Sequence, residues 1–245
     1  MNWMKQLALT VLAMLAFGGL FSEALAEGAT IKGKIKWEGK MFKAKRLKVM
    51  LGHAQCMAIN NGKAPRKQSI VTNENGTLRF VTVYVKNAPK GDYPTPSEPV
   101  VLDQVGCTYS PHIFAVQRGQ DILVKNSDDT AHNIHFTPKK NKEINKSQPK
   151  KGLENTFQMK RGEMAVRIKC DVHPWMFAYC HVFDHPFFAV TGEDGTFEIT
   201  GLPPDTYTVQ TWHEKYESQT LEVTVAQDET KEIEFESYSR DTPKK

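Results

Sequence analysis

The sequence lacks several features that would assign it to a common class of protein. It has no Cys-x-x-Cys-His motif, which excludes covalent attachment of a c-type haem. Its net charge is only +4 over 245 residues and no nucleic-acid-binding motif is present, so nucleic acid is not an expected partner. It also has no set of nucleophile, base and orienting group, so we do not expect an enzyme.

Long apolar runs are absent after residue 26, so the rest of the chain is not expected to span a membrane. At the N-terminus, Lys5 precedes an apolar stretch at 7–20, and Ala24-Leu25-Ala26 follows it. This order is typical of a secretory signal peptide cleaved before Glu27. The mature protein is therefore predicted to be periplasmic or otherwise exported.

Amphipathic helices of convincing length are absent as well, and short β-rich runs separated by turn residues take their place. Residues 196–200, for example, alternate between polar and apolar side chains, as in a half-buried strand. The predicted fold class is all-β. Examples of the expected strands lie at residues 30–37, 78–85, 100–103, 121–125, 164–169, 196–199, 207–212, 221–225 and 232–235.

Two polar stretches interrupt this pattern. Residues 87–99 contain four prolines, which is typical of a linker. Residues 138–152 contain six lysines and a single acidic residue, Glu143, which predicts a solvated, mobile loop. A basic edge that docks an acidic partner is the alternative for this lysine-rich stretch.

The segment from Cys170 to Met176 places a thiol, an imidazole and a thioether at the spacing Cys-x2-His-x2-Met. Soft thiolate and imidazole ligands with a weak axial methionine are typical of copper sites that transfer electrons. Such a site needs a second imidazole. His132, which follows a predicted strand and a polar turn, can supply it.

These two pieces, Cys-Asp-Val-His-Pro-Trp-Met and His-Asn-Ile-His-Phe, resemble the cupredoxin family, in particular its amicyanin-like members, over residues 98–185. The resemblance implies a Greek-key β-sandwich with one type 1 (blue) copper ion. It also implies that Asn133 stabilises the ligand loop by hydrogen bonds. The implied copper ligands are His132, Cys170, His173 and Met176.

The resemblance further implies a one-electron carrier that docks its partner on an apolar patch beside His173, formed by Pro174 and Trp175. The expected partner is a redox protein such as a c-type cytochrome or a periplasmic dehydrogenase. Two other functions stay open, namely copper binding or delivery without redox turnover, and a carbohydrate-binding or structural sandwich with a secondary metal site.

The four cysteines allow other arrangements. Cys170 and Cys180 could form a disulfide, or these two and His173 could bind zinc together with His181 or His185. If Cys170 is a copper ligand, the remaining pair is Cys56 and Cys107, either as a disulfide or as two buried thiols.

The C-terminal part carries a second resemblance. Residues 188–209, with the run Asp-Gly-Thr-Phe-Glu-Ile and a Leu-Pro-Pro-Asp turn, resemble the carboxypeptidase-regulatory, transthyretin-like β-sandwich, and residues 30–39 resemble its first strand. The outer segments could form one sandwich around the cupredoxin unit, or the units could lie in tandem. The predicted organisation is a signal peptide at 1–26, an N-terminal β segment at 27–95, a cupredoxin copper domain at 96–185 and a carboxypeptidase-regulatory-like segment at 186–240.

Overall fold

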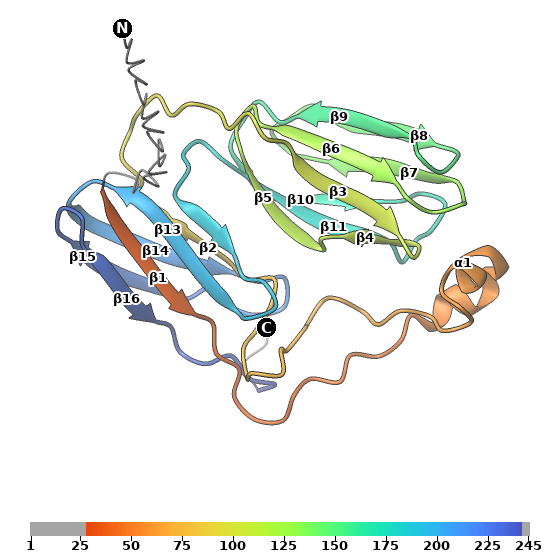
Figure 1. Ribbon diagram of the computed structural model, residues 1–245, viewed down its shortest axis with the longest axis horizontal. Helices are drawn as coiled ribbons and strands as arrows, with labels where there is room; N and C mark the ends of the chain where they lie inside the picture. The colour runs from red at the N-terminus through yellow and green to blue at the C-terminus, as the bar shows by residue number, and fades with distance from the viewer. Residues whose placement is uncertain (1–27, 242–245) are drawn as a thin grey trace, which may run out of the picture.

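The computed structural model describes residues 28–241, and the predicted signal peptide at 1–26 lies outside this range. The described chain forms two β-sandwiches, and a long segment between its first two strands reaches across both (Figure 1). None of the helices in this range is long and apolar enough to cross a membrane. The fold is all-β, as the sequence predicts.

The first sandwich combines strands from both ends of the chain. Its sheets have the strand orders β13-β1-β16 and β12-β2-β14-β15. β1 pairs with β13 and β16, while β2 pairs with β12 and β14. The second sandwich is therefore inserted between β2 and β12, and the two units are not in tandem. The strands are β1 (Ala29–Lys34), β2 (Thr82–Val85), β12 (Phe188–Val190), β13 (Thr196–Leu202), β14 (Asp205–Trp212), β15 (Thr220–Val225) and β16 (Thr230–Glu234).

The second sandwich has sheets of order β4-β3-β6-β9 and β5-β11-β10-β7-β8, the Greek-key arrangement expected from the cupredoxin resemblance. Alternate residues of β6, such as Ile122 and Val124, are fully buried, because successive side chains of a strand point to opposite faces. The strands are β3 (Val100–Val105), β4 (Thr108–Ser110), β5 (Ile113–Gln117), β6 (Asp121–Asn126), β7 (His132–Thr137), β8 (Ile144–Gln148), β9 (Glu154–Gln158), β10 (Glu163–Lys169) and β11 (Phe177–Phe183).

The segment between β1 and β2 leaves the first sandwich, runs to one end of the second and returns (Figure 1). Its part at residues 44–69, here called the cap segment, contains the short helices η1 (Lys48–Gly52) and α1 (Ala54–Ile59). The sequence pattern did not predict these helices, because neither is long enough to show an amphipathic period. Buried residues of the cap segment, Leu47, Met50 and Cys56, belong to the core of the second sandwich.

The lysine-rich stretch at residues 138–152 is more ordered than predicted. It contains β8, whose residues Ile144–Gln148 pair antiparallel with β7. The prediction of a loop over this whole range was therefore wrong. The lysine-rich side chains do not indicate a strand, but hydrogen bonds with β7 satisfy the backbone groups of residues 144–148.

Glu163 anchors the turn that begins this stretch. Its carboxylate accepts hydrogen bonds from the backbone N–H groups of Lys139, Lys140 and Asn141. Burial alone would raise the pKa of Glu163, but these donors hold the pKa below its ordinary value of 4.5. A carboxyl group whose pKa is lowered by folding stabilises the folded state above its unfolded pKa, and this contribution is lost as the pH falls through the folded pKa.

We therefore expect Glu163→Gln to lower the free energy of unfolding at pH 7 by about 1–3 kcal/mol, because one amide cannot accept from all of these donors. The difference from the wild type should shrink as the pH falls below 4.5. Urea unfolding between pH 3 and 7 measures it, with Glu154→Gln on the exposed side of β9 as the control. A difference that does not change with pH would contradict the expectation.

Candidate metal centre

The predicted ligands come from adjacent strands of one sheet. β10 lies between β7 and β11, and Lys169, at the end of β10, pairs with His135 of β7 and with Phe177 of β11. The start of β7, the end of β10 and the start of β11 therefore meet at one end of the sandwich. The loop after β10 is closed by backbone hydrogen bonds from Cys170 N to Met176 O, 3.2 Å, and from Met176 N to His173 O, 2.8 Å.

Three ligand atoms converge there. The Nδ1 atoms of His132 and His173 lie 3.0 Å apart, and Cys170 Sγ lies 3.8 Å from His173 Nδ1. One donor atom from each of the three residues falls within 4.8 Å of the others, and all three side chains are buried. Met176, on the same loop, is 1% exposed. The donor set of one thiolate and two imidazoles fits a single copper ion.

Asn133 connects the two ligand-bearing elements. Its Oδ1 accepts hydrogen bonds from Asp171 N, 2.7 Å, and from Cys170 Sγ, 3.4 Å, and its Nδ2 donates to Asp171 Oδ2, 3.0 Å. The side chain that follows His132 thus fixes the start of the Cys170 loop. This is the position and the kind of contact that the sequence resemblance assigned to Asn133.

The environment favours the ionised thiol. Burial opposes ionisation, but hydrogen bonds with His132 and His173 lower the pKa of the Cys170 thiol to about 6. A cysteine with this pKa is mostly thiolate at neutral pH, which is the form that binds metals.

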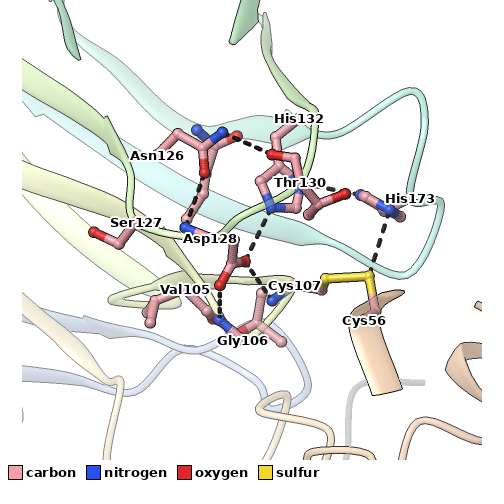
Figure 2. Close-up of polar contacts among 12 residues, drawn as sticks. Cys56, Val105, Gly106, Cys107, Asn126, Ser127, Asp128, Thr130, His132 and His173 are labelled. Carbon is pink, nitrogen blue, oxygen red and sulfur yellow. Dashed lines mark hydrogen bonds and ion pairs between the residues drawn. A yellow bond between two sulfur atoms is a disulfide. The ribbon is translucent and has the colours of Figure 1, made fainter. Parts of the chain in front are cut away.

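Asp128 belongs to the candidate site by its contacts, and the sequence did not indicate it. Figure 2 shows its carboxylate between His132 and the backbone of the β3–β4 turn. His132 Nε2 lies 2.9 Å from Asp128 Oδ2, and the two carboxylate oxygens accept hydrogen bonds from Gly106 N and Cys107 N, each 2.7 Å. A carboxylate on the far nitrogen of a ligand histidine fixes the ring and its tautomer, leaving Nδ1 for the metal.

The other candidate ligand histidine, His173, is contacted by the cap segment. A disulfide joins Cys56 of α1 to Cys107, and Cys56 Sγ lies 3.5 Å from His173 Nε2 (Figure 2). The sequence had left this pair as either a disulfide or two thiols. Because Cys107 also donates its N–H to Asp128, the disulfide links the surroundings of the two ligand histidines.

The cap segment also covers part of the expected docking patch. Trp175 is 7% exposed, its Nε1 donates to Cys107 O at 2.9 Å, and its ring centroid lies 4.5 Å from that of His53. His173 is likewise 7% exposed, while Pro174 is exposed. The expectation that Trp175 offers an open apolar surface was therefore wrong, because nothing in the sequence indicated that the segment between the first two strands folds over it.

The other metal and disulfide arrangements find no support in the structure. Cys170 and Cys180 are both free thiols. None of the groups of clustered ligand atoms found among the described residues includes Cys180, His181 or His185. Cys180 is fully buried in β11 and burial raises the pKa of its thiol, as in a core cysteine.

Comparison with known protein families agrees with the first sandwich. Residues 184–237 match the family model of the carboxypeptidase regulatory-like domain, over the range of β12 to β16. No curated protein matches the chain. Solved structures similar to the chain include three copper proteins. The chain spans about a quarter of the length of the first of them, a nitrite reductase.

The first is a copper-containing nitrite reductase (NirK) from Thermus scotoductus SA-01, with 16% identity over 40% of this chain and 25% of the enzyme and a TM-score of 0.32. The second is a Cu(I) amicyanin variant, with 18% identity over 41% of this chain and 97% of amicyanin and a TM-score of 0.31. The third is a purple cupredoxin from Nitrosopumilus maritimus, with 20% identity over 34% of this chain and 98% of that protein and a TM-score of 0.30. The assignment of a candidate metal site to this chain therefore rests on the geometry of its own residues and not on these likenesses.

Proposed function

We propose that this protein is an exported type 1 copper protein that carries single electrons between redox partners. The observation that carries the proposal is the buried cluster of His132, Cys170 and His173, with one donor atom of each within 4.8 Å of the others. His132 Nδ1, Cys170 Sγ and His173 Nδ1 would hold the ion, with Met176 as a weak axial ligand. Bound copper would supply a reversible one-electron couple.

The chain supports this role by holding the two histidines and the cysteine loop through contacts that need no metal. Asp128 orients His132, Cys56 lies against His173, and Asn133 holds the Cys170 loop. A site whose ligands are already placed needs little rearrangement when the charge of the ion changes, which favours electron transfer. Four protein ligands leave no position for a substrate, so the proposal does not include an enzymatic activity.

The partner in this proposal is a redox protein such as a c-type cytochrome or a periplasmic dehydrogenase. Since the cap segment covers Trp175 and the Nε2 side of His173, such a partner would dock beside the cap, where Pro174 and Val172 are exposed. Copper delivery is the second candidate, because the same ligands would serve it. A copper-delivery protein would give up the ion to an acceptor protein, whereas an electron carrier keeps the ion through repeated oxidation and reduction.

Visible absorption of the copper-loaded, oxidised protein tests the proposal. We expect an intense band near ~600 nm, of the kind that Cu–thiolate bonding produces. Cys170→Ser should abolish the band, while Cys180→Ser, at the other free and buried cysteine, should retain it. A wild-type protein that binds no copper, or a band lost equally in both variants, would refute the proposal.

A further inference from the structure

A cavity of about 340 Å³ lies between the cap segment and the metal-binding loop. Leu47 and Ser69 line it from the cap segment, and Trp175 and Met176 line it from the loop. The Trp175 ring lies against that of His173, with centroids 5.1 Å apart and the planes tilted by 46°, and Met176 is the proposed axial ligand. A molecule in this cavity would therefore touch the residues that surround the ion.

The walls of the cavity are ordered. Residues 44–47 and 64–67 of the cap segment run antiparallel, held by backbone hydrogen bonds from Leu47 to Pro65 and from Lys67 to Lys45, both 2.9 Å. The disulfide from Cys56 to Cys107 ties the cap segment to the second sandwich. On the opposite side, the Tyr109 hydroxyl donates to Asn133 O, 2.7 Å, which holds that ring in place. The cavity is thus a preformed feature of the fold.

The lining carries charge of one sign. Arg66, Lys67 and Lys215 contribute to it, and no carboxylate does. Glu214 lies behind Lys215, with its Oε2 3.6 Å from Lys215 Nζ, but its other oxygen accepts from His112 at 2.6 Å and its side chain is 3% exposed. Arg66 and Lys67 are exposed at the rim. These cations favour an anionic occupant, since opposite charges attract and like charges are excluded.

The rest of the lining is apolar and aromatic. Trp175, Met176 and Phe177 contribute from the metal-binding loop and β11, and Leu47 and Val49 from the cap segment. Cavities of about 300–1,000 Å³ with apolar walls and a few polar groups typically bind small organic molecules. A macromolecular partner would not fit into this volume.

We infer that this cavity binds a small organic anion with an apolar or aromatic body, held against the metal-binding loop with its charge toward Arg66 and Lys67. The inference of a binding site depends on the cavity and its lining, and not on copper. The consequence, that a small molecule of this class meets the copper site on its capped side, rests on the proposed function.

Calorimetric titration of the copper-free protein tests the binding site, with benzoate as the probe and benzyl alcohol as the uncharged probe of the same shape. We expect a dissociation constant of about 1 mM or lower for benzoate, reasonable for a ligand of this size in a fitted site. Benzyl alcohol should bind at least about tenfold more weakly.

Two variants show where the probe binds. Lys67→Glu reverses a charge at the rim and should weaken benzoate binding at least about fivefold, while Lys63→Glu, exposed on the cap segment but outside the lining, should change it less than about twofold. Ser69→Trp should fill the cavity and abolish binding. Absent binding, or binding that survives both Lys67→Glu and Ser69→Trp, would overturn the inference.

The effect of benzoate on the visible spectrum of the copper-loaded protein tests the binding site and the proposed function separately. Saturating benzoate should shift the band near ~600 nm, because the probe touches Met176 and Trp175. A protein that binds benzoate but shows no such band refutes the copper function and supports the binding site. A blue protein that does not bind benzoate refutes the binding site. A band that saturating benzoate does not move refutes contact between the bound anion and the metal-binding loop.

Discussion

Replacing Cys56 and Cys107 together with alanine is expected to lower the free energy of unfolding by about 4 kcal/mol. The two cysteines are 51 residues apart, and the disulfide between them restricts a long loop of the unfolded chain. Removing it restores that conformational freedom and destabilises the folded state. Urea unfolding of the copper-free protein under non-oxidising conditions measures the change, which is a large fraction of the roughly 5–15 kcal/mol by which a typical domain is stable.

The same double variant should loosen the cap segment. Cys56 Sγ lies against His173 Nε2, and Trp175 donates its indole N–H to Cys107 O. Without the disulfide, we expect faster hydrogen exchange of the Trp175 indole N–H and of the backbone within residues 44–69. Cys180→Ala is the matched control, because it removes a buried cysteine that bridges nothing. Equal losses of stability in both, or unchanged exchange in the cap segment, would contradict the expectation.

The strands of the first sandwich could largely be predicted, because most of them leave a local pattern in the sequence, whereas in the second sandwich the expected ranges correspond to β3, β6 and β10. Alternation in β13 (Thr196–Leu202) and the apolar positions of β6 (Asp121–Asn126) show which side of the strand faces the core. The path of the cap segment could not be predicted in this way. Its contacts join Cys56 to residues more than 50 positions away, and sequence separation says nothing about whether two cysteines lie within bonding distance.

The candidate metal ligands could be proposed from the sequence because three of them share one short loop with fixed spacing. The residues that orient these candidate ligands could be predicted only in part. Asn133 follows a ligand directly and was found, whereas Asp128 lies in a turn beside a second aspartate, Asp129. Only the structure distinguishes Asp128 from Asp129. Asp128 is 3% exposed and hydrogen-bonded to His132, whereas Asp129 is exposed. The position of Asp128 four residues before the ligand is the one signal that could have indicated it.

Asp128→Asn is therefore the sharpest test of how the site is held. The substitution keeps the shape of the side chain but replaces one acceptor oxygen with an N–H donor. In the wild type, Oδ1 accepts from Gly106 N, and Oδ2 accepts from both Cys107 N and His132. The amide leaves at least one buried N–H group facing another donor, which costs about 1–3 kcal/mol.

The larger effect of Asp128→Asn is expected at the metal. With no carboxylate on Nε2, the His132 ring is free to turn or to take the other tautomer, so Nδ1 is no longer held toward Cys170 and His173. Losing such a partner typically weakens metal binding by about 10–100-fold. Copper affinity measured by competition with a chelator should fall by this factor.

Asp129→Asn, which changes the exposed neighbour by the same atoms, should leave copper affinity and stability unchanged. If the two variants behave alike, His132 is oriented by its strand alone and Asp128 serves only the turn that carries Cys107. If Asp128→Asn loses stability but keeps its copper affinity, the hydrogen bond to His132 is structural, and the link between the two ligand histidines through Cys107 has no part in metal binding.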